Sequence, residues 1–183
     1  MEIVTTALDG VVEIRPTRRG DERGWFSEVY KQHTLRNAGI NIDFVQDNES
    51  FSAPAGTLRG LHYQVGPHPQ DKLIRVIHGS ILDVAVDIRR DSATFGQHVA
   101  VTLTAEGGNQ LLVPAGFAHG FCTLVADVRV AYKVSGVYAP ECERAIRWDD
   151  PDLAIDWQLP SGDPTLSGKD EIAPFLADQP DLF

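Results

Sequence analysis

The chain has 183 residues, and 26 acidic against 16 basic side chains give it a formal charge of -10 at pH 7. This length predicts one domain spanning 1–183, and a hydrophobic fraction of 43% is enough to fill its core. The negative charge disfavours nucleic acid and anionic membranes as partners, and the uncharged stretch 107–126 is too rich in Gly and polar residues for a membrane helix. Two cysteines, Cys122 and Cys142, and the lack of a signal-like start predict a cytoplasmic protein.

The predicted elements begin with one amphipathic helix at about 31–38 and are otherwise strands. Turn residues separate the strands, which are expected around 58–64, 72–76, 81–89, 98–104 and 128–134. After about Pro160 we expect a looser segment with short helical turns. Short strands separated by turns are typical of an all-β sandwich or jelly roll with a few short helices.

Strict alternation predicts which side chains share a strand face. In segment 58–64 the face of His62 also carries Leu58, Gly60 and Gln64, and the opposite face carries Arg59, Leu61 and Tyr63. In segment 81–89 one face carries Leu82, Val84, Val86 and Ile88 and the other carries Asp83, Asp87 and Arg89, which predicts a half-buried strand.

Three polar side chains fall on inward faces of different strands. They are His62, Lys72, in phase with Ile74, and Tyr132, in phase with Val130. A histidine can take a proton at neutral pH, a lysine can stabilise an enolate oxygen, and a tyrosine can return a proton. Each also has a purely structural interpretation, because Lys72 can extend to solvent and Tyr132 can be a core residue. Alternation leaves open whether the three side chains meet.

One segment resembles the second signature of the cupin superfamily, with Gly108, Pro114, Gly116 and His119 at the characteristic spacing. The first signature departs from that pattern: Gln64 stands where a second metal-binding histidine is expected, and Lys72 stands where an acidic ligand is expected. A lysine ammonium repels a divalent cation. We therefore expect no metal.

A narrower resemblance, to the dTDP-4-dehydrorhamnose 3,5-epimerase family of sugar-nucleotide epimerases, covers nearly the whole chain. It is carried by DERGWFSEVY (21–30), QDNES (46–50), RGLHYQ (59–64), FAHGF (117–121) and LSGKD (166–170) in this order. The resemblance implies a cupin-type jelly roll, a dTDP-4-keto-6-deoxyhexose substrate, no cofactor, and a homodimer in which segment 21–30 reaches the partner.

The resemblance also implies roles for individual residues. His62 is expected to be the general base, Tyr132 the general acid on the opposite sugar face, Lys72 the group beside the oxygen at carbon 4, and Asp170 the carboxylate that orients His62. The implied substrate-binding residues are Arg23, Phe26, Glu28, Gln46, Asp47, Asn48, Arg59, His119, Tyr138, Glu143 and Lys169. Of these, Arg23, Arg59 and Lys169 suit a diphosphate, and Phe26 and Tyr138 suit the thymine ring.

One conflict and several alternatives remain open at this stage. Alternation places Arg59 on the face opposite His62, so a shared ligand needs an irregularity, such as a bulge at Gly60. The expected reaction inverts carbons 3 and 5, and an enzyme that inverts carbon 3 alone is the alternative. A non-catalytic nucleotide-sugar-binding cupin is the alternative from another class, and a metal-dependent cupin enzyme is disfavoured by Lys72.

Overall fold

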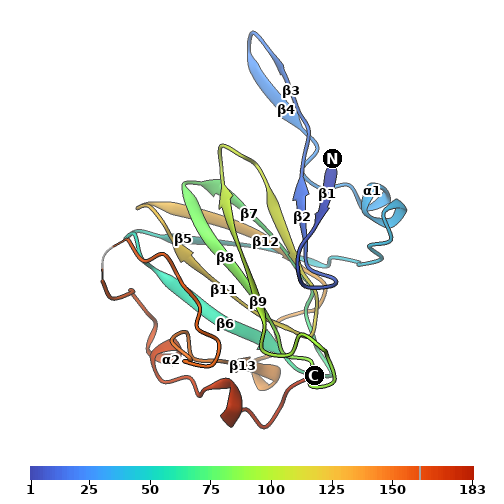
Figure 1. Cartoon of the computed structure of the whole chain (residues 1–183). Helices are drawn as coiled ribbons and strands as arrows, with labels where there is room; N and C mark the ends of the chain where they lie inside the picture. Colours follow the sequence, from blue (N-terminus) through green and yellow to red (C-terminus); the bar gives the residue numbers. More distant parts are fainter. Residues whose placement is uncertain (161) are drawn as a thin grey trace.

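The computed structural model describes residues 1–160 and 162–183 as two antiparallel sheets that face each other (Figure 1). The six-stranded sheet runs in the order β1 (Glu2–Thr5), β2 (Val12–Arg15), β10 (Gln110–Val113), β7 (Lys72–His78), β12 (Val128–Val134) and β5 (Gln46–Ser52). The five-stranded sheet runs in the order β13 (Glu143–Ala145), β6 (Leu58–Gln64), β11 (Phe117–Thr123), β8 (Ser80–Asp87) and β9 (His98–Thr104). This arrangement confirms the predicted all-β jelly roll.

Helical structure is short. It consists of α1 (Gln32–Asn37), α2 (Gly168–Glu171) and two 3₁₀ turns, η1 (Pro140–Cys142) and η2 (Leu176–Asp178). The helix expected at 31–38 is α1, with Lys31 and Ala38 as its caps. No helix among the described residues has the length and apolar character needed to cross a membrane.

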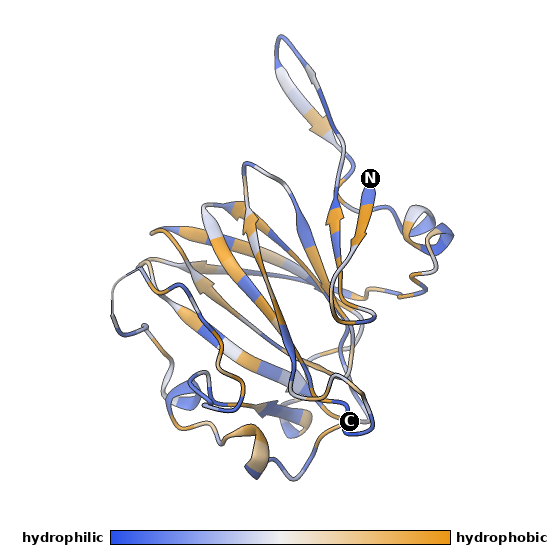
Figure 2. Ribbon diagram, in the orientation of Figure 1, coloured by the Kyte–Doolittle hydropathy of each residue, from blue (hydrophilic) through white to orange (hydrophobic). Residues whose placement is uncertain are grey.

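The core has one apolar layer between the sheets and another behind the five-stranded sheet. Ile74, Val76 and Val130 belong to the inner layer, and the outer layer brings Leu153, Trp157 and Leu176 of the C-terminal third against the strands. In Figure 2 hydrophobic residues follow the strands of both sheets. The looser packing expected after about Pro160 stays a prediction, although Leu176 and Asp170 are buried.

Strand β8 corrects one expectation. It was predicted to be half-buried, but Asp83 and Asp87 on its supposed solvent face are fully buried. The apolar face, with Val84 and Val86, packs under the C-terminal segment, and the other face lies inside the barrel. Asp87 is satisfied there by Arg89 and by two hydroxyls. A strand can thus alternate in sequence and still be buried on both sides when a distant segment covers it.

A hairpin of β3 (Arg18–Asp21) and β4 (Gly24–Ser27) projects away from the two sheets (Figure 1). On its second strand, Trp25 is 59% and Phe26 66% exposed. Two neighbouring exposed aromatic rings on a projecting hairpin are typical of a surface that another molecule covers.

Candidate active site

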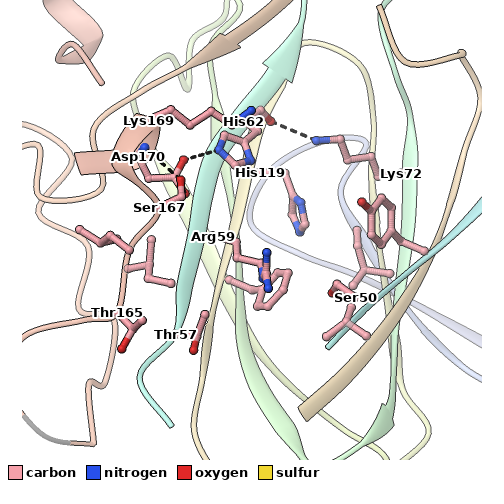
Figure 3. A pocket seen from close by; sticks show the side chains of 16 residues that line it. Ser50, Thr57, Arg59, His62, Lys72, His119, Thr165, Ser167, Lys169 and Asp170 are labelled. Atoms are coloured by element: carbon pink, nitrogen blue, oxygen red, sulfur yellow. Dashed lines mark hydrogen bonds and ion pairs between the residues drawn. The ribbon is translucent and has the colours of Figure 1, made fainter. Parts of the chain in front are cut away.

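A cavity of about 480 Å³ opens between the two sheets (Figure 3). It brings together all four expected catalytic residues and three of the eleven expected binding residues, Arg59, His119 and Lys169. Its lining residues are Ser50, Thr57, Leu58, Arg59, His62, Lys72, Ile74, His119, Phe121, Val130, Tyr132, Thr165, Leu166, Ser167, Lys169 and Asp170. Three strands, β6, β7 and β12, therefore supply His62, Lys72 and Tyr132 to one space, which answers the question that alternation left open.

An irregularity in β6 lets Arg59 and His62 line the same cavity. His119 of β11 pairs with His62, and Phe121 pairs with Arg59, so β6 uses one residue more than β11 over this interval. Such a bulge reverses the phase of the strand. The predicted faces are therefore wrong before Gly60: Leu58 packs behind the sheet, together with Leu61 and Tyr63.

Gly60 makes this bulge possible. Its φ of +131° lies in the region that disfavours L side chains, and an added Cβ would lie 2.5 Å from the Cα of Gly120 on β11. The two strands touch through their backbones at this point. The bulge at Gly60 that the sequence analysis considered is thus confirmed.

His62 forms a short hydrogen-bonded pair with Asp170. Its Nε2 lies 2.5 Å from Asp170 Oδ1, and the Ser167 hydroxyl donates to the other carboxylate oxygen at 2.8 Å. Burial raises the pKa of Asp170, but the hydrogen bond and charge of His62 and the bond from Ser167 leave the pKa below its ordinary value. Because a carboxylate only accepts, Nε2 is the protonated nitrogen, and Nδ1 is the nitrogen left to accept a proton.

Lys72 places a cation at the same cavity. Its Nζ donates to the backbone carbonyl of His62 at 3.1 Å. Burial lowers the pKa of Lys72 to about 8, an effect that the negative charges of Asp83 and Glu143 oppose. The ammonium is therefore retained near neutral pH but lost in mildly alkaline solution.

Tyr132 is the third group of the cavity. Burial raises the pKa of its phenol, and the positive charge of Arg59 opposes that rise. The phenol thus stays protonated at neutral pH and can donate. The structure also places Tyr132 against the inner core layer, so its ring is held by packing while its edge lines the cavity.

A second histidine–carboxylate pair faces the cavity. His119 Nε2 lies 2.7 Å from Oδ1 of Asp83, a fully buried residue of β8. The sequence selected His119 and missed Asp83, because alternation had placed Asp83 on a solvent face. Ser167 was also missed, although its spacing to Asp170 matches a helix N-cap, and its hydroxyl does accept from the Asp170 amide at 3.3 Å.

A smaller cavity of about 320 Å³ continues from the first and shares His62, Lys72 and Tyr132 with it. Its other predicted site residues are Gln46, Asn48, Tyr138 and Glu143. Glu143 joins the two cavities, since it accepts from Tyr138 at 3.0 Å and from Lys169 at 2.8 Å. Tyr138 is an exposed ring at this mouth, available to stack on a planar ligand.

Four predicted binding residues lie away from both cavities. Arg23 and Phe26 are on the projecting hairpin, where Arg23 pairs with Asp21. Glu28 pairs with Lys31, and Asp47 points to the outer face of β5, where its 74% exposed side chain pairs with Lys133. Glu28 and Asp47 instead line a further cavity of about 660 Å³, which shares Tyr132 with both of the others.

The two residues that depart from the cupin metal-site pattern, Gln64 and Lys72, donate to backbone carbonyls in the folded site. Over 1–160 and 162–183, no group of three or more His, Cys, Asp and Glu side chains is arranged to hold a metal ion. Gln64, at the expected second histidine position, instead donates to the carbonyls of His68 and Val137.

Fold and cavity together define a jelly-roll protein with an acid–base site between its sheets. The family model described as dTDP-4-dehydrorhamnose 3,5-epimerase matches residues 5–178. A relative of that name from Sinorhizobium fredii is 48% identical over 170 residues, which cover 93% of this chain and 87% of the relative. The chain therefore belongs to the dTDP-4-dehydrorhamnose 3,5-epimerase family.

Solved structures agree with this membership. A 3,5-epimerase from Legionella pneumophila, in complex with dTDP-4-keto-L-rhamnose, has a TM-score of 0.92 and 46% identity, and the match covers 97% of this chain and 93% of that one. A 3'-monoepimerase from Streptomyces bikiniensis, in complex with dTDP-quinovose, has a TM-score of 0.87 and 34% identity, with coverages of 95% and 87%.

Proposed function

We propose that the protein converts dTDP-4-dehydro-6-deoxy-D-glucose to dTDP-4-dehydro-L-rhamnose by inverting carbons 3 and 5. The observation that carries the proposal is the meeting of the His62–Asp170 pair, Lys72 and Tyr132 in one cavity. These are a base, a cation and an acid, which are the three groups needed to move a proton beside a ketone.

The reaction begins at a carbon next to the ketone at carbon 4. Nδ1 of His62 removes the proton, and Asp170 stabilises the imidazolium that forms. The electrons move to the carbonyl oxygen, where the ammonium of Lys72 stabilises the enolate. Tyr132 then donates a proton to the opposite face, and the inverted ketone is formed. The ketone of the substrate supplies all the activation, so the mechanism has no step for a redox cofactor.

Arg59 and Lys169 are assigned to the diphosphate. Both line the cavity next to the base, and Arg59 is held by Ser52 Oγ at 3.2 Å and the Phe51 carbonyl at 3.1 Å. Guanidinium groups bind phosphate oxygens through paired hydrogen bonds. Gln46, Asn48, His119 and Glu143 are assigned to the sugar and nucleoside, with Tyr138 stacking on thymine.

We assign Arg23 and Phe26 to the active site of a partner chain in a homodimer. Arg23 and Phe26 are exposed on a hairpin that reaches away from its own cavity (Figure 1). A partner chain that received this hairpin would gain a cation for the diphosphate and an aromatic ring for the thymine base.

The free cysteines Cys122 and Cys142 agree with a reducing, cytoplasmic setting.

Inversion of carbon 3 alone is the second candidate, because the chain also resembles a monoepimerase, at 34% identity. The 46% identity to a 3,5-epimerase favours the double inversion. Product analysis separates them: the 4-keto product is reduced with borohydride, hydrolysed and identified. Double inversion predicts L-rhamnose and 6-deoxy-L-talose. Sugars of the 6-deoxy-D-allose and 6-deoxy-D-gulose series indicate carbon 3 alone, and recovery of only 6-deoxy-D-glucose and D-fucose contradicts an epimerase.

A further inference from the structure

One buried hydroxyl in the cavity has no partner. Among the described residues, three buried side-chain atoms lack a hydrogen bond: Ser27 Oγ, Ser50 Oγ and Asp83 Oδ2. Most buried polar atoms in native proteins are paired, so each exception calls for an explanation. Only Ser50 belongs to the lining of the cavity that holds His62, Lys72 and Tyr132.

The neighbours of Ser50 on β5 show that this hydroxyl is the exception in its row. Gln46, Asn48, Ser50 and Ser52 share the inward face of the strand, since outward residues alternate with them. Gln46 donates to Asn48 at 2.7 Å, and Ser52 accepts from Arg59 at 3.2 Å. Ser50 lies between these two satisfied pairs.

Strand register places Ser50 between the proposed acid and the proposed phosphate ligand. Asn48 pairs with Tyr132 on β12, and Ser50 pairs with Val130, one step further along the same face. The next inward residue, Ser52, holds Arg59. In Figure 3 Ser50 lies on the wall across the pocket from Ser167 and Asp170.

The covalent structure of the substrate indicates which of its groups lies next to Ser50. From the reacting carbon 3, the path to the diphosphate passes through carbon 2, which carries a hydroxyl, and then carbon 1. We propose that Ser50 hydrogen-bonds the hydroxyl on carbon 2 of the hexose and so selects 2-hydroxy over 2-deoxy substrates. This inference rests on the proposed function, because it uses the roles of Tyr132 and Arg59 to orient the sugar.

The melting temperature of Ser50→Ala shows whether the Ser50 hydroxyl binds the ligand or stabilises the fold. Ser50→Ala removes a hydroxyl that has no partner in the folded chain, so the melting temperature should stay the same or rise. A hydroxyl that held the strand would lower it on removal. Thr102→Ala serves as the control, because it deletes an exposed strand hydroxyl on β9, in the other sheet.

The decisive experiment compares two substrates on three proteins. Wild type, Ser50→Ala and Thr102→Ala are assayed with the 4-keto-6-deoxyhexose nucleotide and with its 2-deoxy analogue. For the 2-hydroxy substrate, Ser50→Ala should lower kcat/KM about 10-fold, and for the 2-deoxy analogue it should change nothing. Wild type should prefer the 2-hydroxy substrate by about the same factor, and Thr102→Ala should match wild type.

Each other outcome overturns the inference. An equal loss on both substrates would place the Ser50 bond elsewhere on the ligand, and no loss on either would leave it without a ligand role. A fall in melting temperature that accompanies the lost activity would make the hydroxyl structural. If wild type epimerises neither substrate, the proposed function fails and the inference fails with it, and the wild-type assay alone shows this result.

Discussion

In the proposed mechanism, the charge of Lys72 sets the pH range over which the site is active. Burial lowers its pKa to about 8, against the attraction of Asp83 and Glu143. The charged form dominates below that pH and is lost above it. Since only the ammonium stabilises an enolate, kcat/KM should fall as pH rises through about 8.

The test is a pH–rate profile from pH 6 to 10. Lys72→Met should lower kcat by about 10²- to 10³-fold, because it removes a charge aimed at the developing oxyanion. The residual activity of this variant should lack the alkaline fall. An alkaline fall that persists in Lys72→Met would assign it to another group.

Asp170 links the site to stability in acid. Burial raises the pKa of this carboxyl, but His62 and Ser167 more than compensate and lower it below the ordinary value. A depressed pKa contributes stability above the unfolded-state value, and this stability is lost as pH falls through the folded-state value. Below about pH 4, thermal stability should therefore fall less steeply in Asp170→Asn than in wild type.

Melting temperatures between pH 3 and 7 measure this difference. Asp181→Asn is the matched control, because Asp181 pairs with Arg144 at the surface and should leave the slope unchanged. Parallel curves for wild type and Asp170→Asn would show that the pair with His62 does not shift the carboxyl. At pH 7 Asp170→Asn should also reduce kcat, because the imidazolium loses its counter-charge.

At the scale of the element, the bulge in β6 lets one strand present both His62, the proposed base, and Arg59, the proposed phosphate ligand, to the same cavity. In Gly60→Ala the added Cβ would lie 2.5 Å from Gly120 Cα. The alanine would also have to adopt a φ of +131°, which L residues disfavour. We expect a loss of about 3 kcal/mol or more in unfolding free energy, which lowers the melting temperature by about 10 °C. Gly24→Ala is the matched control, because Gly24 has a similar φ of +128° but no atom lies within 4 Å of its added Cβ. Equal melting curves for both variants would contradict the role of Gly60.

Five of the strands, β6, β7, β8, β9 and β12, were predictable from sequence because apolar residues recur at every second position along them. Segments 58–64, 98–104 and 128–134 coincide with β6, β9 and β12. The phase of β6 was not predictable, since a bulge changes alternation without changing composition. The burial of Asp83 was not predictable either, because it depends on a partner, His119, that is 36 residues away.

At the scale of the molecule, the projecting β3–β4 hairpin explains why sequence motifs and the single-chain cavity disagree. Segment 21–30 carries family-like residues, yet Arg23 and Phe26 stay outside the cavity of their own chain. A partner's contribution cannot be recognised from the hydrophobic pattern of one chain, because that pattern records burial without saying which copy provides it. The predicted homodimer therefore needs a direct test, by the kinetics of an Arg23 variant and by sedimentation.

Arg23→Ala should raise KM more than it lowers kcat, because a phosphate contact binds the substrate and transition state alike. Arg36→Ala is the control, since this exposed arginine pairs with Asp43 near α1 and should leave both constants unchanged. Sedimentation at assay concentration should show a dimer for wild type. A fully active monomer would contradict the shared site.

The measurement that tests the account most directly is solvent exchange at the sugar carbons. In deuterium oxide, wild type should place deuterium at carbons 3 and 5, because each inversion replaces a carbon-bound proton with one from an exchangeable acid. His62→Ala should abolish both exchanges. Tyr132→Phe keeps the ring but removes the donor, so exchange from the His62 side should outlast net inversion. Deuterium at carbon 3 alone would establish a monoepimerase, and binding of the nucleotide sugar without exchange at either carbon would contradict catalysis.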